Sequence, residues 1–111
     1  MNKEKRQALE EAGWVFGDAE DFLELTDEER HLVELRLAVS SAFQARRLRR
    51  RLTQSEAAKM LRTSQPRVAK IEAASEVSLD LMFRGLFVLG GTMKDVQSAM
   101  NKSKRAKSQV K

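Results

Sequence analysis

The sequence predicts an all-α protein, and three observations lead to this prediction. Its 111 residues include one proline and five glycines, so few positions disfavour a helix. Apolar residues recur at spacings of three and four, which is typical of amphipathic helices. Residues that favour helix caps stand directly before several of these segments. The length fits one small domain with additional segments at its ends.

The N-terminal residues 1–25 are expected to form an acidic extension. A short helix is predicted over 3–12, followed by the apolar group Trp14, Val15 and Phe16. Residues 1–30 contain four basic and ten acidic residues (net −6), whereas residues 31–111 contain seventeen and six (net +11). This division indicates either two partners of opposite charge or an acidic segment that only aids solubility. The aromatic group could extend the core or anchor a partner.

A long helix is predicted from Thr26 to about Arg50. Thr26 and Glu29 have the spacing of a capping box, in which each side chain accepts from the other residue's backbone N–H. Its inner face is expected to carry five apolar residues, namely Leu32, Leu35, Val39, Ala42 and Phe43.

Two short helices are expected next, over 54–61 and 65–72. Thr53 and Ser64 can cap them, and Pro66 falls in the first turn of the second helix, where its missing N–H is no loss. The inner faces are predicted to carry Ala57, Ala58, Leu61, Val68 and Ile71. Helices this short are not stable alone, so they must pack on each other and on a third helix.

Two more helices complete the predicted domain, which spans 26–100. Ser78 can cap a helix that ends near Gly90, and Thr92 and Asp95 can begin a last helix that ends near Met100. The inward residues of the first are expected to be Leu79, Met82, Phe83, Leu86 and Phe87. The basic tail 101–111 is predicted to be disordered because it has almost no apolar residues.

The start of the helix 65–72 concentrates polar side chains at Ser64, Gln65, Pro66, Arg67 and Lys70. A helix presented by this end can enter the DNA major groove, where Gln pairs with adenine edges and Arg with guanine edges. The alternative is a helical hairpin with a solvated polar face, and periodicity alone does not separate the two.

The segment "LTQSEAAKMLRTSQPRVAKIE", Leu52–Glu72, resembles the helix-turn-helix of the lambda-repressor and Cro-like (Xre) regulators. The resemblance implies a five-helix domain that binds a palindromic double-stranded DNA operator as a homodimer. It also implies that Gln54 anchors a phosphate and supports Gln65, and that Arg47 and Glu72 form a structural ion pair. The chain departs from this family's pattern at two frequent glycine positions, occupied by Arg51 and Arg62, and in the loop after Glu72.

Five arginines crowd the end of the long helix in "RRLRRR", Arg46 to Arg51. Such a cluster beside the motif can follow the DNA backbone and add affinity without sequence information. The cluster predicts phosphate contacts at Arg46, Arg49, Arg50 and Arg51, and to these the resemblance adds Gln54 and the turn between the short helices adds Arg62. The alternative is complementation of the helix dipole on a solvated face.

Composition argues against other classes of function. The chain has no cysteine and one histidine, His31, and lacks a glycine-rich phosphate loop, so we expect no enzyme, metal site or cofactor. The most apolar stretch, 79–91, contains Asp80 and Arg84 and is too short to span a bilayer. We therefore expect a cytoplasmic protein without a membrane partner.

An N-terminal extension before this motif also resembles antitoxins of the HigA type, which repress their own operon and bind a basic RNase toxin. Under that alternative, the acidic arm with Trp14, Val15 and Phe16 would contact the toxin. A third interpretation is a basic adaptor or RNA-binding protein. Dimerisation could use the last helix, through Met93, Val96 and Met100, or the N-terminal arm.

Overall fold

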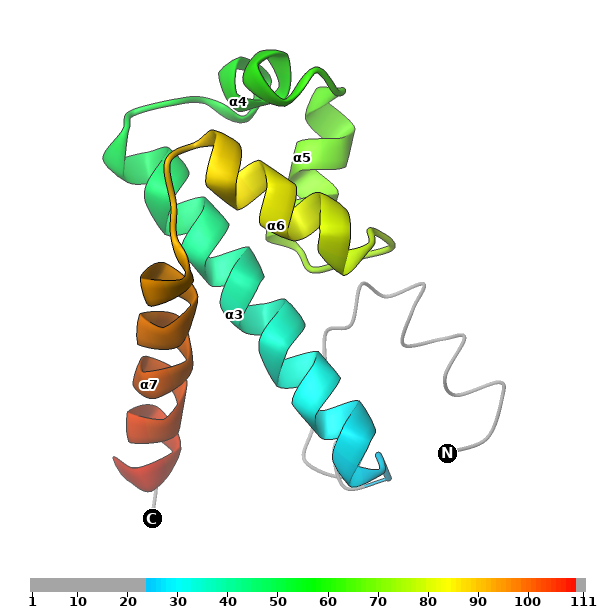
Figure 1. Cartoon of the computed structure of the whole chain (residues 1–111), viewed down its shortest axis with the longest axis vertical. Coiled ribbons are helices and arrows are strands. Elements are labelled where there is room, and N and C mark those ends of the chain that lie inside the picture. Colours follow the sequence, from blue (N-terminus) through cyan, green and yellow to red (C-terminus); the bar gives the residue numbers. More distant parts are fainter. Residues whose placement is uncertain (1–23, 110–111) are drawn as a thin grey trace.

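The computed structural model describes residues 24–109, and this part of the chain folds into helices joined by short connections (Figure 1). The helices are α3 (Asp27–Arg49), α4 (Gln54–Leu61), α5 (Gln65–Glu72), α6 (Leu79–Val88) and α7 (Met93–Gln109). The all-α prediction is confirmed. The predicted helix over 3–12 and the group Trp14, Val15 and Phe16 lie outside the described residues.

Helix α3 is the long helix on which α5, α6 and α7 pack, whereas α4 packs on α5 and α6. Helix α3 begins with the predicted capping box: the Glu29 N–H donates to the Thr26 hydroxyl, and the Thr26 N–H donates to the Glu29 carboxylate. Its buried face contains Val33, Val39 and Phe43. Leu25, just before the helix, is also buried, so the folded body begins at least one residue before the predicted boundary at Thr26.

Two predicted core residues are exposed instead. Leu32 is 51% exposed because Val33, one position on, occupies the inward face of α3. Phe87 is 50% exposed, although its ring contacts that of Phe83 at a centroid distance of 5.8 Å. In both cases the apolar stripe is wider than the surface that covers it, so periodicity overestimates the buried set.

Helices α4 and α5 have the predicted bounds because each has a strong start. Thr53 and Glu56 form a capping box at α4, and the Ser64 hydroxyl accepts from the Arg67 N–H at α5. The two helices are joined by a tight turn in which Arg62 has φ 57° and ψ 47°. The left-handed conformation expected at this position is thus adopted by a non-glycine residue, at a cost of about 1–2 kcal/mol.

Helix α6 lies close to α3 and α4 at Gly85. A Cβ added there would lie 2.9 Å from Leu61 Cδ2 and 3.0 Å from Phe43 Cε2, so a hydrogen atom at this position permits the close approach. The Ser78 hydroxyl caps the helix by accepting from the Leu81 N–H, as predicted. Beyond its end, Gly90 turns the chain with φ 89°.

Helix α7 is longer than predicted. It was expected to end near Met100, but it continues to Gln109, so the prediction of a disordered tail is wrong for 101–109. The sequence there is rich in Lys, Arg, Ala and Gln, which favour a helix, and positive charge near a helix C-terminus complements its dipole. No helix in the part of the chain that the structure describes is long and apolar enough to cross a membrane.

The five described helices share one core. Val96 attaches α7 to it, and Met100 and Ala99 pack at its edge. The largest fully buried side chains come from α3, α5, α6 and α7 and from the connection between α6 and α7, and they are Phe43, Ile71, Met82, Leu86, Leu89, Val33, Val39, Val68 and Val96.

Candidate nucleic-acid interface

Helix α5 buries one side and exposes its N-terminal end. Val68 and Ile71 are fully buried between α5 and the core, which fixes the orientation of the helix. The residues predicted to contact bases are all exposed, namely Ser64, Gln65, Pro66, Arg67 and Lys70. Figure 1 shows α5 at one side of the molecule, with its first turn beside α4 and with α6 nearer its other end. The end that the motif would offer to DNA is therefore accessible.

Two glutamines connect the first turns of α4 and α5. Gln65 Nε2 donates to Gln54 Oε1 at 2.7 Å, and Gln54 Nε2 donates to Glu72 Oε1 at 3.3 Å. Gln54 is the first residue of α4, and Gln65 is the first residue of α5. The contact predicted between the two is thus present, and it connects the exposed amide of Gln65 to the interior of the domain.

Arg47 and Glu72 form the predicted ion pair between α3 and α5. Arg47 Nε donates to Glu72 Oε2 at 2.5 Å and Nη2 donates to Oε1 at 3.0 Å, while Nη1 donates to the Leu52 carbonyl at 2.8 Å. The side chains are only 12% and 5% exposed. The hydrogen bonds with Glu72 raise the pKa of Arg47, and the guanidinium stays charged. A bidentate pair of this kind sets direction as well as distance.

Two further hydrogen bonds hold the C-terminal end of α5, and neither was predicted from the sequence. Ser40 Oγ donates to the Glu72 carbonyl at 2.6 Å, and Arg36 Nη2 donates to the Ala74 carbonyl at 3.2 Å. A signal was available in the sequence, because Arg36, Ser40 and Arg47 follow helical spacing along one side of α3. Polar residues that interrupt an apolar face in this way often bind the backbone of a neighbouring helix.

The turn between α4 and α5 leaves the Arg62 side chain exposed. The Arg62 and Thr63 N–H groups donate to carbonyls in the last turn of α4, including a 2.9 Å bond from Thr63 to Ala58. Arg51 also has a left-handed backbone, with φ 57°, and is exposed. Neither guanidinium forms an ion pair with a described residue, so both are available to an external anion.

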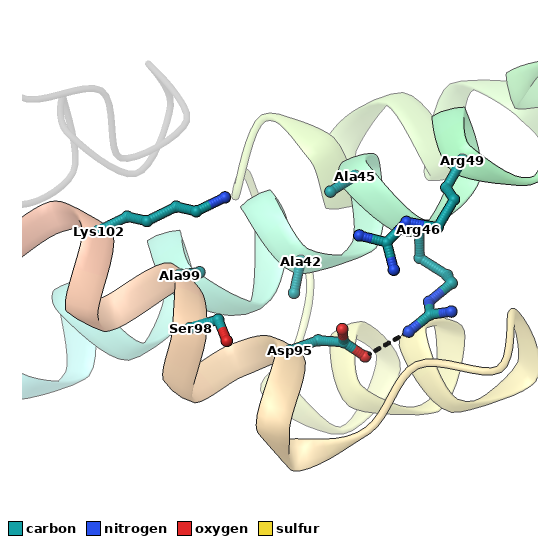
Figure 2. A pocket seen from close by; sticks show the side chains of 8 residues that line it. All are labelled: Ala42, Ala45, Arg46, Arg49, Asp95, Ser98, Ala99 and Lys102. Atoms are coloured by element: carbon teal, nitrogen blue, oxygen red, sulfur yellow. Dashed lines mark hydrogen bonds and ion pairs between the residues drawn. The ribbon is translucent and has the colours of Figure 1, made fainter.

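The other arginines of the cluster, Arg46, Arg49 and Arg50, lie toward α7 or the connection before it, unlike Arg51. Arg46 Nη2 lies 2.9 Å from Asp95 Oδ2 on α7, and Arg50 Nη1 donates to the Leu89 carbonyl at 3.1 Å. Arg49 lies beside Arg46 and Asp95, on the side of α3 that faces α7 (Figure 2). Three of the predicted phosphate contacts are thus directed toward α7 or the connection before it, and two of them already have protein partners.

Lys70 has a partner that was not anticipated. Its ammonium group lies 3.1 Å from the carboxylate of Glu76, and the two side chains are 50% and 46% exposed. Glu76 belongs to the loop after α5 and has a left-handed backbone with φ 47°, as does Ala74 with φ 55°. The loop sequence had left its geometry open, so this pairing could not be predicted.

Comparison with known families identifies the segment. Residues 43–84, from the second half of α3 to the middle of α6, match a family model described as helix-turn-helix. This segment is a Cro/C1-type helix-turn-helix domain. The chain is therefore a DNA-binding regulator, and its fold is the lambda-repressor-like one that the sequence predicted. Neither a curated protein nor a solved structure matches the chain.

Proposed function

We propose that the protein is a dimeric, sequence-specific repressor that reads a palindromic operator with α5. The observation that carries the proposal is the exposed amide of Gln65, which is held by Gln54 at the first turn of α5. A glutamine in this place can donate and accept one hydrogen bond each with adenine in the major groove. Arg67 lies two residues further along α5 and is exposed, so it can donate to guanine.

Ser64, Pro66 and Lys70 would complete the reading surface. Ser64 and Pro66 flank Gln65, where a hydroxyl or a pyrrolidine ring can contact a base edge or a thymine methyl group. Lys70 is one turn further on and would have to leave Glu76 to reach DNA. Each of these residues is exposed, as the proposal requires.

The proposed phosphate contacts differ in how freely each side chain can reach a phosphate. Arg51 and Arg62 are the strongest candidates because both are exposed without a described ion-pair partner. Gln54 adds a contact at the N-terminus of α4, where free backbone N–H groups favour an anion. Arg46 and Arg50 would have to exchange a protein partner for a phosphate, and Arg49 lies with Arg46 near α7.

For dimerisation we favour the end of α6 and the start of α7. Phe87, Val88 and Met93 are 50%, 38% and 56% exposed, and only a short turn separates them in the chain. Apolar side chains that are exposed close together often mark an interface. Of the predicted dimer residues, Val96 is buried in the core and Met100 packs against it, so Met93 remains available. A twofold axis here would have to set two copies of α5 about 34 Å apart.

Selection of bound fragments from random duplex DNA at about 0.15 M salt tests the function. We expect a palindromic site, and Gln65→Ala should then lose about 1–3 kcal/mol on that site with little change on scrambled DNA. Arg84→Gln, an exposed charge change on α6, is the control. An equal loss on both duplexes would refute the role of Gln65, and selection without any enriched duplex would favour the RNA-binding or adaptor interpretation.

The dimer has its own experiment. Phe87→Ser should shift the sedimentation coefficient from that of a dimer to that of a monomer and should weaken binding to the full palindrome more than binding to a half-site. Leu32→Ser, which removes an apolar side chain of similar exposure on α3, is the control. A dimer that persists in Phe87→Ser but dissociates after removal of residues 1–23 would assign the contact to the N-terminal arm instead.

The second candidate function is that of an antitoxin, and the contrast between net −6 over 1–30 and net +11 over 31–111 favours it. We infer that Trp14, Val15 and Phe16 would then bind a small basic toxin. Co-expression with the product of the adjacent gene and a pull-down test this function. Deletion of 1–23 keeps Leu25 in the core and should abolish capture while leaving duplex binding intact. Absence of a short basic neighbour would count against it.

A further inference from the structure

A pocket of about 220 Å³ lies between α3 and α7, and its lining includes Arg46 and Arg49, the two proposed phosphate contacts that face α7 (Figure 2). Three alanines, Ala42 and Ala45 on α3 and Ala99 on α7, line it. Because these side chains are small, they leave an open space where the two helices pack together. In Figure 1, α7 and α5 lie on opposite sides of α3, so the pocket is separate from the end of α5 that would read DNA.

Positive charge surrounds this space on two sides. Figure 2 shows the guanidinium groups of Arg46 and Arg49 together at one end, while the ammonium group of Lys102 reaches in from the other. The one carboxylate in the lining is Asp95, whose Oδ2 atom accepts from Arg46 at 2.9 Å and from the Thr92 N–H at 2.7 Å. Three cations therefore face one carboxylate, which leaves an excess of two positive charges.

One residue of the lining also has a hydrogen-bond donor that the protein does not use. The Nε atom of Arg46 is buried and has no partner among the described residues. A buried donor without a partner is costly. Ser98 lines the same space, as does Arg49, whose charge acts on Asp95.

We propose that this pocket binds an anion of the phosphate class. Guanidinium groups bind phosphate oxygens in a directed, often bidentate way, and an ammonium group and a hydroxyl can satisfy the remaining oxygens. The site takes donors from Arg46 and Arg49 on α3 and from Ser98 and Lys102 on α7. A bound anion would therefore hold the two helices together and stabilise the packing of α7.

The phosphate group could belong to a free small anion or to the DNA backbone. The position of the pocket favours the free anion, because α7 and α5 lie on opposite sides of α3 (Figure 1). Arg49 and Lys102 are exposed, so the affinity should fall as salt is added.

Amide NMR of the full chain tests the proposal with inorganic phosphate, added against potassium chloride at equal ionic strength. We expect saturable shifts confined to residues near 42–49 and 95–102. Arg49→Gln and Lys102→Gln should each weaken binding by roughly fivefold or more, because each removes one charge-assisted contact. Ala45→Leu should block the pocket without a change of charge, and Arg84→Gln, an exposed charge change on α6, should leave phosphate binding within about twofold.

Duplex binding by the same variants distinguishes the two sources. Saturable phosphate shifts, with duplex affinity unchanged in Ala45→Leu, identify a free anion. No response to phosphate, with a flatter salt dependence of duplex binding in Arg49→Gln and Ala45→Leu, identifies the DNA backbone as the source. A third outcome would overturn the proposal: phosphate causes no saturable amide shifts, and duplex binding is unchanged in Arg49→Gln and Ala45→Leu although the amide spectra show that both variants are folded. The pocket would then hold only water.

Discussion

The side-chain amide of Gln65 donates a 2.7 Å hydrogen bond to that of Gln54, and this contact joins the first residue of α5 to the first residue of α4. Gln54 donates in turn to Glu72, which is paired with Arg47. An exposed glutamine ordinarily samples many rotamers, and its ordering on binding costs about 0.5–1.5 kcal/mol. In this protein part of that ordering is already complete before DNA arrives.

Gln54→Ala should therefore weaken binding to the selected operator by about 0.5–1.5 kcal/mol, because Gln65 would then be ordered only on binding. In a double-mutant cycle with Gln65→Ala, the two losses should be less than additive by at least 0.5 kcal/mol or so. Fluorescence anisotropy with the operator duplex measures both. Gln97→Ala, an exposed glutamine on α7, is the control, and strict additivity would contradict the proposed support.

The ion pair between Arg47 and Glu72 should be important for stability. Glu72→Ala leaves a guanidinium that is only 12% exposed without its carboxylate, and we expect a loss of about 3 kcal/mol in urea denaturation. Arg47→Met combined with Glu72→Leu removes both charges and should cost less than Glu72→Ala alone. A single-mutant loss below about 1 kcal/mol would show that the pair contributes no more than an exposed one.

The helices were predictable because their starts are encoded locally. Thr26, Thr53, Ser64 and Ser78 each cap the helix that follows, and α4 and α5 have the predicted bounds. The pattern of apolar residues was less informative about burial, since Leu32 and Phe87 share the right spacing but lie beyond the surface that other helices cover. The end of α7 was missed because 101–109 has almost no apolar residues, although its helix propensity is high.

The contacts of the candidate site that belong to the sequence motif were predictable, and the contacts that depend on how distant helices pack were not. Gln54, Gln65, Arg47 and Glu72 make the contacts that the resemblance implied. The arginine cluster looked uniform in sequence, yet Arg46 is bound by Asp95, 49 residues away along the chain. The sequence around either residue does not predict this pairing, because it depends on how α7 packs against α3.

Stability should fall in acid, partly through Asp95. A hydrogen bond from the Thr92 backbone and then the Arg46 side chain lower the pKa of Asp95 below its ordinary value of 3.8. The unfolded chain therefore binds this proton more readily, and the stabilisation is present above pH 3.8 and is lost as the pH falls toward the pKa of the folded state. Asp95→Asn should unfold more easily at neutral pH and should show a shallower loss of urea midpoint in acid.

The control for this titration is Asp80→Asn, which removes an exposed carboxylate from the first turn of α6. Its acid dependence should follow that of the parent chain. Identical pH profiles for Asp95→Asn and the parent would show that this carboxylate contributes nothing to acid unfolding. The side chain of Asp95 is 25% exposed, so solvent screens part of its interaction with Arg46 and the expected difference is modest.

Removal of the Glu76 carboxylate should strengthen DNA binding. Glu76 lies 3.1 Å from the Lys70 ammonium group and would repel a phosphate at the same place. Glu76→Gln keeps the size of the side chain and its left-handed backbone, so the change is one of charge alone. Since an exposed pair contributes about 0.2–1 kcal/mol, we expect the duplex affinity to rise roughly two- to fivefold, and its salt dependence to become steeper by up to about one unit.

Glu28→Gln is the matched control, because it makes the same charge change at an exposed position in the first turn of α3. If both variants gain affinity equally, the effect is one of net charge and not of Lys70. Lys70→Gln in the Glu76→Gln background should then abolish the specific gain, since the partner released by the first change is absent. A gain that survives in this double variant would mean that Glu76 acts on DNA directly and that Lys70 does not contact it.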